Sequence, residues 1–224
     1  MVTEVNIQAA ARLRSRLLSW DYADNALDHL RKYFDSNVDH SHVLAKASAI
    51  DKLYSTRGGN IYWLANAVVA AMVEIDLVTA HGVKLDAADV VNAVSRRKSW
   101  LYPGSDRCAS FASKYCHFFV DGWDFLIYDS FALAAVNNLL GERQYHLTPR
   151  RSEYRDFCER VERLLDRNDL KVETRDLDRY LWLWGQWLVQ RGYERQRVNR
   201  DVFDLFKSDD PAVRQDVALL APVA

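Results

Sequence analysis

Apolar residues recur at intervals of three and four along most of the chain, which is the spacing that gathers side chains on one face of an α-helix. Residues 6–34 show this pattern, with an interruption expected near residues 19–24. It returns after Thr148-Pro149 and after Thr174, where a hydroxyl side chain can cap a helix N-terminus. Period-two alternation never extends beyond a few residues. The pattern therefore predicts an all-α protein of about nine or ten helices.

The run from Ile61 to Ala80 is apolar on nearly all sides, which predicts a buried central helix that ends at His81-Gly82. Asn66, Glu74 and Asp76 interrupt the run, so no uninterrupted apolar stretch reaches the roughly 18 residues expected of a membrane span. The first sixteen residues carry charge and contain no apolar signal-peptide core. We therefore expect a cytoplasmic protein with no membrane partner.

Three tryptophans, Trp182, Trp184 and Trp187, lie within the helix predicted after Thr174. Tryptophan at this density most often packs helices together, and less often forms a surface on which nucleic acid bases stack. At the end of the chain, residues 209–224 are expected to form a loosely held tail.

Length and composition predict one globular helical domain over residues 1–224. Within it, two lobes are conceivable: residues 1–100 together with 145–224, and a hairpin and active-site segment at 101–144. The three cysteines are odd in number, and neither they nor the six histidines show the spacing of a zinc site. We therefore expect no metal and no cofactor, and structural roles for the cysteines.

The net charge of −1 is not that of a strongly basic nucleic-acid-binding protein. Residues 96–114 nevertheless carry a local balance of +4, because five basic residues stand against Asp106. Such a patch can hold a few phosphates, or its first three members can simply complement a helix C-terminus. The five basic residues are Arg96, Arg97, Lys98, Arg107 and Lys114.

Lys114 lies at the edge of an apolar arc on a helix predicted over residues 107–119. At that position the lysine would be partly desolvated, which favours the neutral amine that can act as a nucleophile. The alternative is that the aliphatic stem follows the protein surface and brings the ammonium group to solvent. The opposite, polar face of the same helix consists of Ser110, Ser113 and His117.

Asp129 interrupts an otherwise apolar run at residues 125–136. A buried carboxylate there needs hydrogen bonds or a positively charged partner. It could cap a helix that begins at Ser130, or it could act as an electrostatic catalyst. The two roles are compatible.

Residues 101–130 resemble the active-site layout of a known enzyme superfamily. Leu101-Tyr102-Pro103-Gly104 is similar to the Leu-Pro-Gly opening of its hairpin, and Ser113-Lys114-Tyr115 is similar to its hydroxyl-lysine step. The segment Leu126 to Ser130 is similar to its aspartate at the start of a helix. The superfamily is that of the helix-hairpin-helix DNA glycosylases, and the 8-oxoguanine DNA glycosylases and bacterial proteins with their fold look most similar.

The resemblance implies two helical lobes around a central cleft, and a duplex DNA partner with a modified base. The target nucleotide would be flipped into a pocket, where Lys114 would attack the sugar C1′ and form a Schiff base that permits strand cleavage. Asp129 would stabilise the positive charge on the sugar. Contacts to DNA would come from Arg107, Ser110 and Ser113, and the base pocket could be lined by Tyr115, Trp123 or Tyr128.

Two other functions stay open. The same helical fold could bind DNA or a protein without catalysis. The chain could also be an all-α interaction or regulatory domain unrelated to DNA, which its net charge near zero favours.

Overall fold

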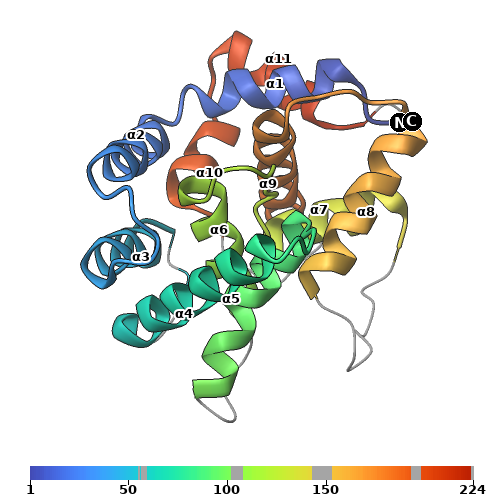
Figure 1. Ribbon diagram of the computed structural model, residues 1–224. Coiled ribbons are helices and arrows are strands. Elements are labelled where there is room, and N and C mark those ends of the chain that lie inside the picture. Colours follow the sequence, from blue (N-terminus) through green and yellow to red (C-terminus); the bar gives the residue numbers. More distant parts are fainter. Residues whose placement is uncertain (55, 57–59, 102–107, 143–152, 193–197, 223–224) are drawn as a thin grey trace. The chain divides into compact units, whose positions relative to one another are not determined.

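The computed structural model describes residues 1–54, 56, 60–101, 108–142, 153–192 and 198–222, except for the side chains of residues 97–101. Within these ranges the chain forms eleven α-helices and no strand (Figure 1). The all-α prediction is therefore confirmed. Thr148-Pro149, where a helix start was predicted, lies outside the described ranges.

The chain divides into two compact units. Unit 1 comprises residues 1–21, 129–151 and 156–224, and unit 2 comprises residues 22–128 and 152–155. These boundaries differ from the lobes predicted from the sequence, which were divided near residues 100 and 144.

Unit 2 is built mainly from five consecutive helices, of which the first begins within unit 1. They are α2 (Leu18–Tyr33), α3 (His40–Tyr54), α4 (Ile61–Ala80), α5 (Ala87–Leu101) and α6 (Ala109–Phe119). Helix α4 contacts α3 and α5, and α6 contacts the same two helices. Asn60 caps α4 by accepting a hydrogen bond from the Tyr62 N–H at 3.0 Å.

Helix α4 is less enclosed than its apolar sequence predicts. Leu64, Val68 and Ile75 are buried in the core, whereas Tyr62 and Leu77 are 64% and 57% exposed. By length and composition alone, α4 could cross a membrane, whereas no stretch long and apolar enough for a membrane span was expected from the sequence. In its most apolar window 44% is buried within the protein, as in the core helix of a globular domain.

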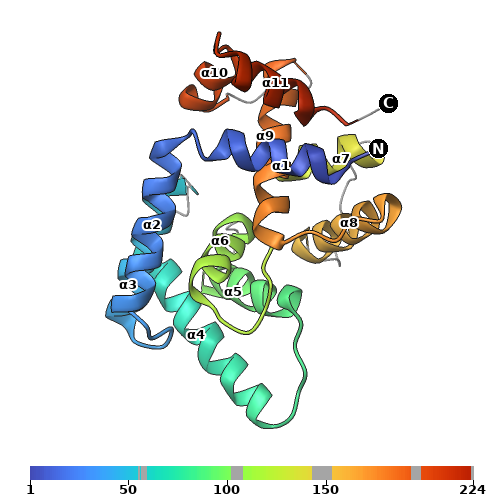
Figure 2. The same cartoon turned by 90° about the horizontal axis from the view of Figure 1, so that it is seen from above.

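Unit 1 contains the remaining helices, except that the first three residues of α8 belong to unit 2. They are α1 (Glu4–Arg14), α7 (Ser130–Leu140), α8 (Glu153–Asn168), α9 (Thr174–Gln190), α10 (Arg200–Phe206) and α11 (Pro211–Leu220). Helix α9 contacts both α1 and α7, as the two views show (Figures 1 and 2). Gly185 permits the second contact, since a Cβ atom at this position would lie 2.1 Å from the Phe131 carbonyl oxygen. Trp184 is 3% exposed and stacks on Trp187, and the Trp20 and Trp182 rings meet edge to face, so all three α9 tryptophans pack within unit 1.

Two sequence predictions about unit 1 are wrong. The break expected near residues 19–24 lies earlier, at Ser15–Leu17, between α1 and α2. The expected loose tail contains α11, which Asp210 caps through the Ala212 N–H at 2.8 Å. Helix α11 packs on α1, where the Asn6 side chain donates to the Leu219 and Ala221 carbonyls.

Candidate functional site

Lys114 is buried in unit 2 and only 3% exposed. Its Nζ atom donates to Ser110 Oγ at 2.9 Å, one turn earlier on α6, and to the Tyr128 carbonyl at 3.5 Å. The stem therefore does not carry the ammonium group to solvent, which was the alternative left open by the sequence. The amine instead lies among protein oxygens at the edge of the apolar face of α6.

The two serines predicted to contact DNA have different environments. Ser110 is half-buried and accepts the bond from Lys114. Ser113 is fully buried, and its hydroxyl accepts from the Tyr128 N–H at 3.0 Å. Direct contact between Ser113 and a phosphate would require this side chain to become exposed, so its place in the structure is that of a link between α6 and residue 128.

Further side chains bind the segment that leads to Tyr128. His117 Nδ1 lies 2.7 Å from the Phe125 carbonyl oxygen, and the Tyr154 hydroxyl donates to the Leu126 carbonyl at 2.9 Å. Together with Ser113 and Lys114, they fix the main chain of residues 125–128 within unit 2. Tyr154 was not among the predicted site residues, because no local pattern connects it with a segment 28 positions earlier.

Asp129 is the N-cap of α7, and its Oδ1 atom accepts from the Ala132 N–H at 2.9 Å. The capping interpretation is therefore confirmed. The carboxylate is half-buried rather than buried, although it interrupts an apolar run. Asp129 begins a segment of unit 1, whereas Lys114 belongs to unit 2.

The other predicted site residues are placed as follows. Arg107 and residues 102–104 lie outside the described ranges. Tyr115 is completely buried, and its hydroxyl donates to Asn37 Oδ1 at 2.8 Å. Burial raises the pKa of the Tyr115 hydroxyl. The other aromatic residue predicted to line the base pocket, Trp123, is half-buried and donates its indole N–H to the Leu85 carbonyl at 3.0 Å. Tyr115 therefore packs in the core of unit 2 rather than lining a base pocket.

Lys46 is a second buried lysine in unit 2, at 1% exposure, and the sequence prediction did not include it. Its Nζ atom donates to the Ser36 carbonyl at 2.9 Å and to Asn37 Oδ1 at 2.6 Å. It also lies 5.8 Å and 5.3 Å from the ring centres of Tyr115 and Phe119. Burial lowers the pKa of Lys46 to about 8.

No metal site emerges from the described part of the chain, where no group of three or more His, Cys, Asp or Glu side chains could hold an ion. All three cysteines lie within the described residues, and none of them forms a disulfide. Cys116 is completely enclosed, and this burial raises the pKa of its thiol. It is therefore a core residue, as the sequence predicted.

Comparison with known proteins gives one result. No curated protein and no solved structure matches the chain. The model of one family, HI_0787_N, described as an N-terminal domain, matches residues 6–121, slightly more than half of the 224 residues. The match includes Lys114 and ends before Asp129. On this match, the chain belongs to the HI_0787_N family.

Proposed function

We propose that the protein is a DNA glycosylase that excises a flipped, modified base, with Lys114 as nucleophile and Asp129 as the stabilising carboxylate. The observation that carries the proposal is the environment of the Lys114 amine. It is 3% exposed and donates to a neutral hydroxyl and to a main-chain carbonyl. A buried amine that protein oxygens hold in a fixed position is suited to nucleophilic attack on a sugar carbon.

The proposed reaction begins when the Lys114 nitrogen attacks the sugar C1′ while the bond from C1′ to the base breaks. The bonding electrons leave with the base, which takes up a proton. Opening of the sugar ring gives a Schiff base between Lys114 and C1′. Loss of a C2′ proton then expels the 3′ phosphate by β-elimination. Asp129 would offset the positive charge that develops on the sugar.

The start of α6 supports a DNA contact. Helix α6 begins at Ala109, and N–H groups in the first turn of a helix can bind a phosphate. Ser110 stands in the same turn.

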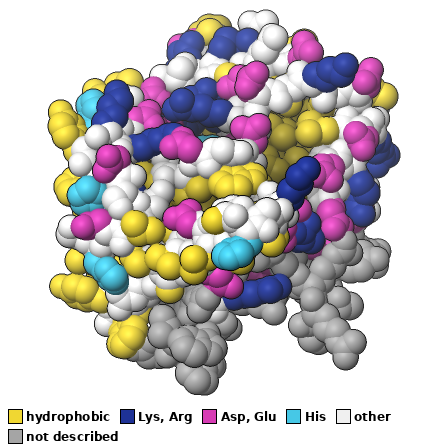
Figure 3. Space-filling model, in the orientation of Figure 1, with side chains coloured by type: hydrophobic (Ala, Val, Ile, Leu, Met, Phe, Trp, Pro, Cys, Tyr) yellow, Lys and Arg dark blue, Asp and Glu magenta, His cyan; other side chains and the backbone are white. Residues whose placement is uncertain are grey.

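The face drawn in Figure 3 carries basic and acidic side chains interspersed, without one continuous basic area among its coloured residues. We therefore expect only two or three phosphate contacts, and a slope of about −2 to −3 for the logarithm of affinity against that of salt concentration.

Borohydride trapping tests the proposal. The protein is incubated with duplexes that contain an abasic site, 8-oxoguanine or normal guanine, and covalent adducts are counted after reduction. Wild type is expected to form an adduct with a lesion duplex, and Lys114→Ala and Asp129→Asn are expected to form none. Lys46→Met, which removes the other buried amine of unit 2, and Lys52→Ala, which removes an exposed one, should retain it.

One observation favours a second candidate, a non-catalytic helical module that binds DNA or a protein. Lys114 donates to the Tyr128 carbonyl, next to the two bonds of Ser113 with the same residue, so the amine could serve only to hold this segment. Lesion-independent DNA binding without an adduct would favour this module. Absence of salt-sensitive binding to any duplex would contradict both a glycosylase and a DNA-binding module.

A further inference from the structure

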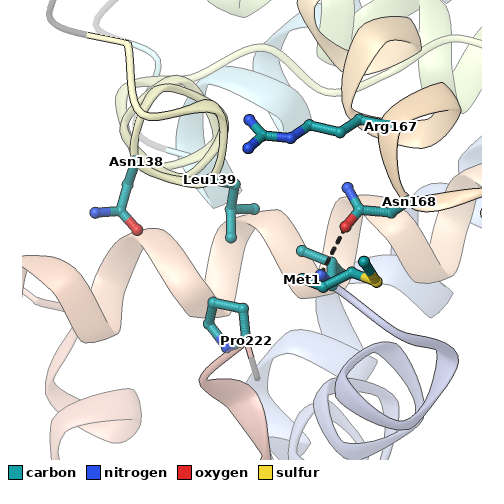
Figure 4. A pocket seen from close by; sticks show the side chains of 7 residues that line it. Met1, Asn138, Leu139, Arg167, Asn168 and Pro222 are labelled. Atoms are coloured by element: carbon teal, nitrogen blue, oxygen red, sulfur yellow. Dashed lines mark hydrogen bonds between the residues drawn. The ribbon is translucent and has the colours of Figure 1, made fainter. Parts of the chain in front are cut away.

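A cavity of about 360 Å³ lies within unit 1. Figure 4 shows its lining, which comes from both the beginning and the end of the chain and from the C-terminal turns of α7 and α8. The volume falls in the lower part of the range for small-molecule sites, about 300–1,000 Å³. The lining residues are Met1, Val2, Asn138, Leu139, Arg167, Asn168 and Pro222. Neither Lys114 nor Asp129 is among them, so the cavity is independent of the proposed glycosylase site.

Arg167 is exposed to solvent, and no carboxylate of the lining neutralises its positive charge. No Asp or Glu lines the cavity, and within the described part of the chain no carboxylate forms an ion pair with Arg167. Its one hydrogen bond there, 3.3 Å to the Leu140 carbonyl, is long. Arg163, one turn earlier on α8, differs because it binds Glu142 at 2.9 Å.

The C-termini of α7 and α8 lie beside the cavity, and Arg167 donates to one of their carbonyls, that of Leu140. Helix C-termini carry partial negative charge on carbonyls that lack helical donors. Here most of those carbonyls are bound already. On α7, the Gly141 and Glu142 N–H groups donate to Asn138 and Asn137 at 3.1 and 2.9 Å. On α8, Asn168 Nδ2 and the Leu170 N–H bind the Leu164 and Leu165 carbonyls.

The oxygen atoms of the two carboxamides in the lining already accept hydrogen bonds. Asn138 Oδ1 accepts the Trp184 indole N–H at 3.2 Å, which orients its NH₂ group away from that bond. Asn168 Oδ1 accepts the Val2 N–H at 2.8 Å (Figure 4). With both carboxamide oxygens occupied and the Arg167 guanidinium group in the lining, the cavity suits a ligand that accepts hydrogen bonds and carries negative charge.

The rest of the lining is apolar. Val2 is 3% exposed, and Leu139 and Pro222 are half-buried. Figure 4 shows the Arg167 guanidinium group close to Leu139, with Pro222 on the other side of that leucine. A bound oxyanion would therefore have apolar surface next to it.

We propose that this cavity binds a small organic anion, whose carboxylate or phosphate group is held by Arg167 while a short apolar portion lies against Leu139 and Pro222. A planar carboxylate and a tetrahedral phosphate are recognised in the same way, because the oxygen atoms of both accept hydrogen bonds from the N–H groups of a guanidinium.

The test is a titration followed by ¹H–¹⁵N NMR of arginine and asparagine side chains, on protein with no residue added before Met1. The probes are hexanoate, phenyl phosphate, inorganic phosphate and hexylammonium. We expect saturable shifts with hexanoate or phenyl phosphate at concentrations up to about 20 mM. Arg167→Gln should weaken binding at least about tenfold, and Asn138→Asp should weaken it by repulsion. Arg163→Gln is the matched control and should bind within about twofold of wild type.

Three results would overturn the proposal. One is the absence of saturation with both organic anions. Another is an equal loss of binding in Arg163→Gln and Arg167→Gln, which would indicate general charge attraction. The third is binding of hexylammonium or inorganic phosphate as tight as that of the organic anions, because the charge or the apolar contact would then contribute nothing. Circular dichroism of each variant establishes that the helices are retained.

Discussion

Ser113 on α6 holds the main chain of Tyr128 through its hydroxyl, which accepts from the Tyr128 N–H at 3.0 Å and lies 3.4 Å from the Tyr128 carbonyl oxygen. The serine is completely buried, so water cannot replace it as a partner of that N–H group. A buried donor that loses its acceptor retains its full desolvation cost.

Replacement of Ser113 by alanine should therefore destabilise the protein by about 1–3 kcal/mol, because it leaves the Tyr128 N–H unsatisfied. Ser110→Ala should cost less than about 1 kcal/mol, since Ser110 is half-buried and water can bind Lys114 in its place. Urea unfolding followed by circular dichroism measures both. Equal losses for the two variants would contradict the distinction drawn between them.

The capping role of Asp129 and its negative charge can be tested separately by two substitutions. Asparagine can still accept from the Ala132 N–H, so Asp129→Asn should change the free energy of unfolding by only a few tenths of a kcal/mol, whereas Asp129→Ala should cost about 1 kcal/mol. If the proposed function holds, both variants lose base excision, although only one loses stability. An Asp129→Asn protein that unfolds as easily as Asp129→Ala would show that the charge itself stabilises α7.

Lys46 should make stability depend on pH above neutrality. Burial lowers the pKa of its amine to about 8, with the charge of Asp35 raising the pKa and that of Arg31 lowering it. In the unfolded chain the pKa is about 10.4. Between these values the unfolded state binds more protons, so the contribution of Lys46 to stability rises as pH increases from 8 to about 10.4.

The measurement compares wild type with Lys46→Met by urea unfolding at several pH values across that window. Methionine keeps most of the buried stem but cannot be charged. Wild type should gain on the order of 2 kcal/mol relative to the variant between the two ends of the window. Taking the difference cancels the other lysines and tyrosines, which titrate in the same range. A difference that stays constant with pH would show that the pKa of Lys46 is ordinary.

The helices could be predicted from the sequence because their signal is local. A spacing of three and four marks the face that each helix buries, and the polar interruption at Asp129 marked the cap of α7. Helix α11 was missed because Asp209, Asp210 and Pro211 suggest a loop or tail. The same residues form its N-terminus, and its stability depends on contact with α1 near the other end of the chain.

The candidate site was predictable only in part. The position of Lys114 beside an apolar arc suggested desolvation, and the structure buries it. Its partner Tyr128 could not be identified, because the bond depends on how the chain returns past α6. A local signal for Lys46 did exist. On a helix this lysine falls on the same face as Val43, Ala47 and Ile50, all of which are buried.

Gly185 provides the clearest test of the packing in unit 1. Alanine is ordinarily favoured over glycine within a helix by about 1 kcal/mol. At this position its Cβ atom would lie 2.1 Å from the Phe131 carbonyl oxygen and 2.8 Å from its Cα atom, both of which belong to the backbone of α7. Helices α7 and α9 would have to move apart, so Gly185→Ala should destabilise by several kcal/mol, at or above the usual range of about 1–3 kcal/mol for overpacking.

The control is Gly192→Ala, at a position with φ of +83° and open space around the added Cβ, which should cost only about 1 kcal/mol. Thermal unfolding of both variants decides the matter, since a Gly185→Ala protein as stable as wild type is incompatible with the close contact of α7 and α9.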